Sequence, residues 1–302
     1  MRRISAVRLC LVALLLLIAA PAPAQEPPLS IKVFDGGSDH GGFDVISVLV
    51  MGKRDAVLVD AQFTLSNAHR LVASILESGR RLTTVYITHS HPDHYFGLPV
   101  IKTAFPQVRI VALPAVLKEI GKENDFKIEY WGRVLGDNGP KTTVEIDPLE
   151  GHTIDLEGNA LEIIGPMQGD SPDNSMVWIP AIRTLIAGDV AYNREHLWEG
   201  SSKHPDQRKA WLASLDRADA LKPEVVVPGH APVGHEMDPG AVQFSRDYLE
   251  TFERELAKTA SGEELIAVMT RHFPEAGLPI CLQVGASVLK DNKVWDGEPW
   301  LK

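Results

Sequence analysis

The most constraining feature of this chain is a group of side chains that can bind metal, directly after a short apolar run. Residues 82–87 are typical of a buried strand, and a helix is expected to begin soon after Gly97. Between them lie four such side chains within six residues: His89, His91, Asp93 and His94. The fold must therefore place a strand-to-helix turn here and gather these side chains around it.

The order of the four side chains predicts two neighbouring metal ions. In an extended segment residues i and i+2 point the same way, so His89 and His91 can address one ion. Asp93 and His94 lie further round the turn and can address a second ion about 3.5–4 Å away. Imidazole and carboxylate groups suit zinc, iron, manganese or cobalt, whereas calcium and magnesium prefer oxygen ligands. A polar surface turn with chance histidines is the alternative, and this order of residues argues against it.

The stretch His89-Ser90-His91-Pro92-Asp93-His94 resembles the H-x-H-x-D-H signature of the metallo-β-lactamase superfamily. The resemblance extends over about residues 31–233. It implies an α/β fold of four layers, an αββα sandwich with the metal site at one edge between two sheets. It also implies two divalent ions, with Zn²⁺ expected and iron or manganese as alternatives. In such a site Asp93 would orient the attacking hydroxide, and Asp60 would support the metal loop from behind.

Two later motifs resemble further ligands of the same family. Gly188-Asp189 follows an apolar strand and matches the motif whose aspartate bridges the two ions. Pro228-Gly229-His230 follows a second apolar strand and matches the motif that supplies a terminal histidine. Either motif alone would be interpreted as a turn. Their order after the signature favours metal binding.

One position departs from the family pattern. The family usually has a histidine between the signature and the bridging aspartate, but the turn here reads Gly-Pro-Met-Gln-Gly-Asp-Ser-Pro over residues 165–172. Alignment on Ser171-Pro172 puts Asp170 at the histidine position, and a carboxylate also binds zinc. We therefore expect Asp170 to be a ligand. The alternatives are that Asp170 only caps the turn while Gln168 or water fills the shell, or that the first metal site is weak.

Three residues after the bridging aspartate are candidates for the substrate wall: Tyr192, His196 and Trp198. Tyr192 or His196 would donate a hydrogen bond to a developing oxyanion. His196 could instead reach a metal and replace the missing imidazole. The alternative is that Tyr192 and Trp198 are packing residues.

The remaining pattern predicts two sheets packed together with helices outside. Strands are expected at residues 29–34, 43–51, 56–60, 82–87, 108–113, 143–146, 153–156, 160–164, 175–179, 184–187 and 225–227. Helices are expected at residues 66–78, with Ser66 as the N-cap, and at 98–104, 114–135, 209–221, 241–258 and 263–273.

The first 24 residues are predicted to be a signal peptide. Three arginines precede an apolar stretch at residues 9–20, and Ala22-Pro23-Ala24 resembles a cleavage site, so the mature chain would begin at Gln25. The apolar stretch is short for a membrane span. We therefore expect a periplasmic or secreted protein without a stable membrane anchor.

The mature chain is expected to comprise the metallo-β-lactamase-like domain at residues 25–240 and a helical extension at residues 241–302 that packs on it. The formal charge of −10 argues against nucleic-acid binding, which needs a basic surface. Cys281 would have no disulfide partner and is expected to be a buried thiol and not a nucleophile. The sequence leaves the oligomeric state open.

These features predict an exported binuclear hydrolase. A metal-bound hydroxide would attack a small ester, lactone or similar carbonyl substrate. A β-lactamase is the second interpretation, although a typical β-lactamase retains the histidine that Asp170 replaces. An iron-containing redox protein is a third interpretation, because the same ligands hold iron, and a non-catalytic metal-binding protein is a fourth.

Overall fold

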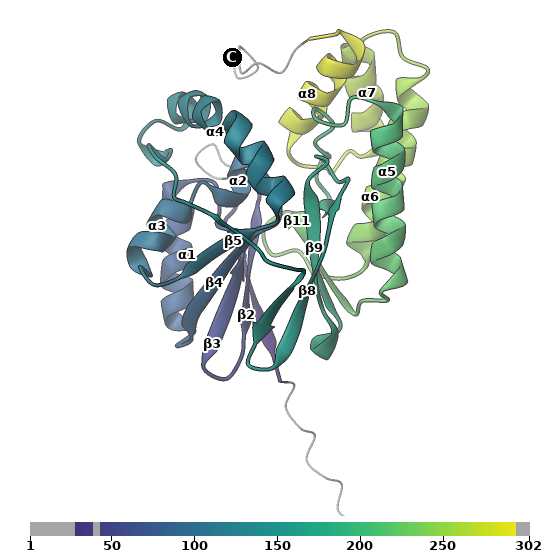
Figure 1. Cartoon of the computed structure of the whole chain (residues 1–302). Coiled ribbons are helices and arrows are strands. Elements are labelled where there is room, and N and C mark those ends of the chain that lie inside the picture. Colours follow the sequence, from purple (N-terminus) through teal and green to yellow (C-terminus); the bar gives the residue numbers. More distant parts are fainter. Residues whose placement is uncertain (1–27, 39–42, 294–302) are drawn as a thin grey trace, which may run out of the picture.

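The computed structural model describes residues 28–38 and 43–293, so the predicted signal peptide lies outside the described residues. Two β-sheets form the centre of the molecule (Figure 1). The first sheet has the order β1 (Ser30–Asp35), β2 (Ile46–Met51), β3 (Asp55–Val59), β4 (Arg81–Ile87), β5 (Arg109–Ala112) and β6 (Asp147–Pro148). The second has the order β11 (Val225–His230), β10 (Thr184–Tyr192), β9 (Asn174–Ile179), β8 (Asn159–Met167) and β7 (Thr153–Leu156).

Helices cover the outer faces of both sheets (Figure 1). Beside the first sheet lie α1 (Leu65–Glu77), the short α2 (Pro92–Tyr95), α3 (Leu98–Ala104) and α4 (Pro114–Leu135). Beside the second lie α5 (Pro205–Ala220), α6 (Gly240–Leu256), α7 (Gly262–His272) and α8 (Pro279–Lys290). The predicted αββα sandwich is confirmed.

Two apolar clusters hold these layers together. The first lies mainly among β2 to β5 and the helices that cover them. Strands β2 and β3 are buried over almost their whole length, because both faces of the first sheet are covered. The second cluster joins β9, β10 and β11 to α5, α6, α7 and α8. The C-terminal helices therefore share one core with the second sheet.

The strand directions bring the ends of several strands to one edge. Strands β3, β4 and β5 run parallel, so their carboxyl ends meet at the same side of the first sheet. In the second sheet β10 and β11 are also parallel. A β-bridge between Val45 and His230 joins the two sheets there. Residues that follow these strands are thus gathered in one place.

Two local predictions are wrong. The strand expected at 143–146 lies instead at Asp147–Pro148, as a two-residue edge strand. The N-cap of α1 is Thr64, not Ser66, because Thr64 has the extended backbone of a cap and its side chain accepts a hydrogen bond from the amide of Asn67.

Helix α8 lies within the predicted helical extension, but no separate helix was predicted at residues 279–290. Its buried residues include Cys281, Leu282, Val284, Ala286 and Val288, which occupy most of its circumference. A helix that is apolar on nearly every side gives no amphipathic period, so its pattern cannot be separated from that of a buried strand. No helix in the described ranges combines the length and apolar character that a membrane crossing requires.

Candidate metal centre and substrate pocket

The signature residues lie in the turn after β4, as predicted. His91 caps the short helix α2, and Pro92 occupies the first helical position, where a missing amide hydrogen costs nothing. Asp93 and His94 therefore project from one helical turn, while His89 lies in the bend between β4 and that helix. Because the backbone conformation changes here, the side chains of His89 and His91 point to one group and those of Asp93 and His94 point to another.

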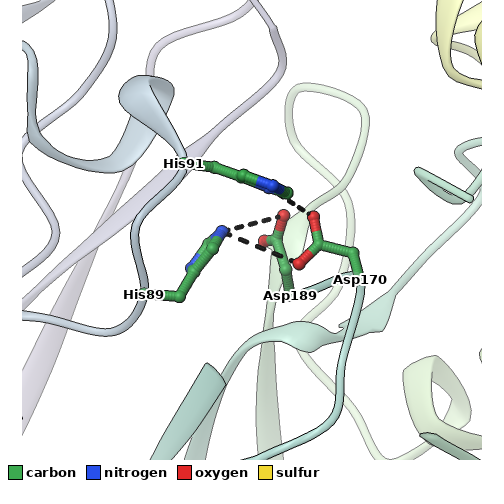
Figure 2. A group of neighbouring side chains, drawn as sticks. All are labelled: His89, His91, Asp170 and Asp189. Atoms are coloured by element: carbon green, nitrogen blue, oxygen red, sulfur yellow. Dashed lines mark ion pairs between the residues drawn. The ribbon is translucent and has the colours of Figure 1, made fainter. Parts of the chain in front are cut away.

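The first group joins residues of both sheets (Figure 2). Figure 2 shows His89 and His91 reaching from one side toward Asp170 and Asp189 on the other. His91 Nδ1 lies 2.7 Å from Asp170 Oδ2, and His89 Nε2 lies 3.5 Å from Asp189 Oδ2 and 3.8 Å from Asp170 Oδ1. One ligand atom from each of the four residues lies within 4.8 Å of the others. This spacing suits a single ion.

A second group lies directly beside the first. It contains Asp93, His94 and His230, again with ligand atoms within 4.8 Å of one another. Asp189 contacts this group as well, because Oδ1 lies 3.2 Å from His94 Nε2 and Oδ2 lies 3.2 Å from His230 Nε2. Among the described residues, Asp189 is thus the one carboxylate that forms ion pairs with histidines of both groups.

Two glycines allow Asp189 to take this position. Gly188 has φ +50°, a conformation that glycine adopts without steric cost, and β10 is irregular in register at this point. A Cβ atom on Gly229 would lie 1.9 Å from Asp189 Oδ1. The glycines of the Gly188-Asp189 and Pro228-Gly229-His230 motifs are therefore needed to bring β10 and β11 together at the centre.

The orientation of two histidines is fixed from behind by Asp60. Its carboxylate accepts hydrogen bonds from the amide and the hydroxyl of Thr88, at 2.9 and 2.8 Å, and from His94 Nδ1 at 2.8 Å. The Thr88 hydroxyl, which donates to Asp60, accepts in turn from His89 Nδ1 at 3.0 Å. Both imidazoles therefore direct Nδ1 to these outer partners and Nε2 to the centre.

We predict that Asp60→Asn lowers metal affinity about 10–100-fold, the range typical for loss of a ligand's outer partner. Asparagine tolerates the backbone at this position, φ +60°, but it has one acceptor oxygen and cannot replace both carboxylate oxygens, which accept hydrogen bonds from Thr88 and His94. Competition with a chelator measures the affinity. Asp55→Asn, which removes an exposed pair with Arg81, is the control. Equal affinity in wild type and Asp60→Asn would show that this contact does not support the ligands.

Asp170 lies at the position that the alignment on Ser171-Pro172 predicted, beside His89 and His91. It is fully buried, and its Oδ1 accepts a hydrogen bond from Asn174 Nδ2 at 2.8 Å. Burial raises the pKa of Asp170 to about 6, although the His91 imidazole acts in the opposite direction. Gln168 instead donates to Gly169 and Ser202. The alternative in which Gln168 fills the shell therefore does not fit the structure.

The nitrogen and oxygen atoms of the two ligand groups fit a cation. Within the described part of the chain, His89 Nε2, His94 Nε2 and Asp189 Oδ1 are buried and have no hydrogen-bond partner. An unsatisfied buried polar group costs about 1–3 kcal/mol, so three together call for a common partner. Burial and the His94 imidazole lower the pKa of His89, which keeps that ring neutral. Burial opposes ionisation of Asp189, but the imidazoles of His230 and His94 hold its pKa well below the usual range.

A cavity of about 280 Å³ opens above the two groups. Its floor includes His91, Asp93, Asp189 and His230. Its walls are largely aromatic and come from Phe43, Phe126, Tyr130, Trp131 and Trp198. Lys127 also lines it, with Nζ 2.9 Å from Glu123 and 3.2 Å from the Ser90 carbonyl oxygen. The metal-binding groups thus face a pocket lined by aromatic and charged side chains, of a size that suits a small molecule.

The three candidates for the substrate wall have different positions. Trp198 lines the cavity, and its ring centroid lies 6.1 Å from that of His91. Tyr192 also lines the cavity, but its hydroxyl lies 2.7 Å from Asp189 Oδ2 and 3.2 Å from Asp170 Oδ2, so its single proton is directed to these two carboxylates. Its ring stacks on His230, with centroids 4.9 Å apart.

His196 requires a correction. It is not among the described residues that line the cavity, and its Nδ1 lies 2.9 Å from the hydroxyl of Tyr248 on α6. Burial lowers the pKa of His196 to about 4, so the ring is neutral. The backbone turns at Arg194, which has φ +51°, and this turn directs His196 away from the metal-binding groups. It neither lies on the substrate wall nor replaces the missing imidazole.

Two parts of the pocket could not be recognised in the sequence. Helix α4 was predicted with its correct bounds, but its aromatic residues could be read only as core, although Phe126 is 43% exposed and lines the cavity. Cys281 is buried as predicted, and burial raises the pKa of its thiol. Its place on the cavity wall was not expected. The aromatic residues of α4 and Cys281 line the pocket only because of tertiary packing, which the sequence does not show.

The fold and the paired metal-binding groups define a metal-dependent hydrolase of the αββα type. A family model described as "Metallo-beta-lactamase superfamily" matches residues 40–230, and the chain therefore belongs to this superfamily.

Several known proteins are similar to this chain. It is 26% identical over 199 residues to a metallo-beta-lactamase type 2 of Bacillus cereus, which covers 64% of this chain and 68% of that protein. It is 28% identical over 69 residues to a hydroxyacylglutathione hydrolase of Stenotrophomonas maltophilia (strain R551-3), which covers 21% of this chain and 26% of that protein. A metallo-beta-lactamase family protein from Thermus thermophilus is similar in fold, with a TM-score of 0.62 and 19% identity over 87% of this chain and 92% of its own.

Proposed function

We propose that this protein hydrolyses a small ester or lactone with the help of two zinc ions. The observation that carries the proposal is the position of Asp189, whose carboxylate contacts histidines of two adjacent ligand groups. A bridging carboxylate between two N/O ligand sets is typical of a two-metal hydrolytic centre. Imidazole and carboxylate ligands are those that zinc prefers.

Each ion would have a defined set of protein ligands. His89, His91, Asp170 and Asp189 would hold the first, and Asp93, His94, His230 and Asp189 the second. When bound, such ions supply Lewis acidity that polarises a carbonyl and lowers the pKa of a water molecule. The chain itself contributes the rigid arrangement of these ligands through Asp60 and Thr88.

Asp93 is the residue that we assign to orientation of the attacking water. It is 7% exposed and lies on the cavity floor, with Oδ2 3.4 Å from His230 Nε2 and 3.7 Å from His94 Nε2. A carboxylate in this position can accept a proton from water while one oxygen remains directed at the metal-binding group. The adjoining aromatic walls would exclude bulk water from the reacting carbonyl.

The presence of Asp170 favours esters and lactones over amides. With Asp93 and Asp189 it places three carboxylates around the two groups, so two divalent ions would keep less net positive charge than with a neutral imidazole at that position. A less positive centre polarises a carbonyl less strongly. Esters and lactones are more reactive than amides and need less polarisation, so they suit this centre best.

A β-lactamase is the second candidate. It is favoured by the similarity to metallo-beta-lactamases type 2 of Bacillus cereus, Bacillus sp. (strain 170) and Pseudomonas aeruginosa, each over more than half of this chain. The strained amide of a β-lactam is more reactive than an ordinary amide. We rank it second because Asp170 occupies the position where a typical β-lactamase has a histidine.

An assay panel separates the candidates. We expect zinc-loaded protein to hydrolyse a lactone or an activated ester with kcat/KM of at least about 10⁴ M⁻¹s⁻¹, the lower range for natural substrates. Hydrolysis of nitrocefin at that level with weak ester cleavage would favour the β-lactamase. A thioester and a phosphodiester complete the panel, and the Asp93→Asn variant is the control for background cleavage. Failure on all four substrates would contradict the proposed reaction.

We also propose that the chain is exported. The arginines, the apolar stretch and the small residues before Gln25 support this proposal. Intact mass spectrometry of the protein isolated from a periplasmic fraction should give a chain that begins at Gln25. A cytoplasmic protein that retains Met1 would contradict it.

A further inference from the structure

The first turn of α8 contributes one side chain to the cavity wall. Cys281 is 2% exposed, and it lines the cavity together with Asp93, Tyr192 and Trp198. It lies outside residues 40–230, the part of the chain that matches the superfamily model. A residue of the C-terminal helices is therefore part of the pocket above the metal-binding groups.

The segment that carries Trp198 is bound tightly to the start of α8. The amide of Gly277 donates to the Arg194 carbonyl, and the amide of His196 donates to the Gly277 carbonyl, both at 3.0 Å. A Cβ atom on Gly285 would lie 2.8 Å from Glu199 Cβ, and one on Gly200 would lie 3.1 Å from Val284 Cγ1. Because backbone and side chains are in close contact along this seam, the wall at Cys281 cannot move back to admit a larger group.

The side chain of Cys281 is also small for a residue on this cavity wall. Many of the residues that line the same cavity have large aromatic side chains, whereas a thiol is a small, weakly polar group that packs as an apolar one. The space in front of Cys281 therefore depends directly on the size of residue 281. A substrate group that extends from the metal-binding floor toward α8 would end against this side chain.

We propose that Cys281 is a specificity-determining residue that limits the length of the apolar acyl group of the substrate. The substrate class is then a short-chain ester or lactone whose acyl chain lies between Trp198 and α8. This inference rests on the proposed hydrolysis. Cys281 acts only as a wall, and no bond to its sulfur is formed.

Two variants of opposite size test the proposal. Cys281→Ala enlarges the pocket and Cys281→Met shortens it, and both are compared with wild type on p-nitrophenyl acetate, butyrate, hexanoate and octanoate. We expect the ratio of kcat/KM for hexanoate to that for acetate to rise about 10-fold or more in Cys281→Ala, the effect of about one methylene in an apolar pocket. In Cys281→Met the same ratio should fall. A residue with a structural role alone would change all four esters by one common factor.

Leu282→Ala is the matched control, since Leu282 is buried in the same helix but does not line the cavity. It should lower the melting temperature and leave the ratio unchanged. Binding of acetate, butyrate, hexanoate and octanoate to the zinc-loaded proteins, measured by calorimetry, provides a readout that does not depend on turnover. Opposite shifts in chain-length preference would support the proposal even if no ester were hydrolysed. Identical preference in wild type, Cys281→Ala and Cys281→Met, or no binding of any carboxylate to wild type, would overturn it.

Discussion

Asp189→Ala is expected to lower kcat/KM by more than about 100-fold, beyond the effect of losing a ligand's outer partner. The reason is that Asp189 contacts His89, His94 and His230, so its loss would weaken both ligand groups at once. Metal content should fall below one ion per chain. Elemental analysis after dialysis and steady-state kinetics on the best ester of the panel measure the two effects.

Asp216→Ala is a suitable control for this variant, because Asp216 is an exposed partner of Arg246 and lies on α5. It should keep full metal content and full activity. Circular dichroism checks that Asp189→Ala retains its fold. If folded Asp189→Ala kept both ions and wild-type activity, the assignment of Asp189 as the bridge would be wrong.

The second large effect is expected at Asp170. Asp170→Ala should lose about one ion per chain, because it removes one of three ligands that belong to the first group alone. Asp170→His should keep two ions, and a neutral imidazole should increase the positive charge of the centre. We therefore expect its relative activity on nitrocefin to rise compared with that on esters.

The Asp170→Ala variant also distinguishes a role of Asp170 as a metal ligand from a role in capping the turn at residues 165–172. Asp170 accepts a hydrogen bond from Asn174, so Asn174→Ala is the control that loosens the turn but keeps the carboxylate. Loss of an ion in Asp170→Ala and retention of both in Asn174→Ala is the predicted pattern. Unchanged stoichiometry in Asp170→Ala would contradict the ligand assignment and support a purely structural role.

Much of the centre could be predicted from the sequence because its residues lie in or just after recognisable strands. His89 and His91 come after a buried strand, and Asp189 and His230 accompany glycines that the close approach of two strands requires. Local chemistry and backbone geometry coincide at these positions. The order of these motifs in the chain was therefore enough to predict that their residues lie together at one edge of the sandwich.

Other features depend on tertiary contacts that leave no local pattern. His196 follows the Asp189 strand closely in sequence, yet the turn at Arg194 directs it to Tyr248. Phe126 and Cys281 look like ordinary core residues, and only the packing of α4 and α8 across the pocket makes them part of its wall. Nearness in sequence to a predicted ligand was a poor guide to the substrate wall.

Hydrolysis is expected to depend on two metal ions held by the seven residues of the two ligand groups. Elemental analysis of the purified protein, combined with an ester assay before and after removal of metal by a chelator, tests this dependence most directly. We expect about two zinc ions per chain, loss of activity on chelation and recovery when zinc is returned. Full ester hydrolysis by protein that retains no metal would contradict the proposed mechanism.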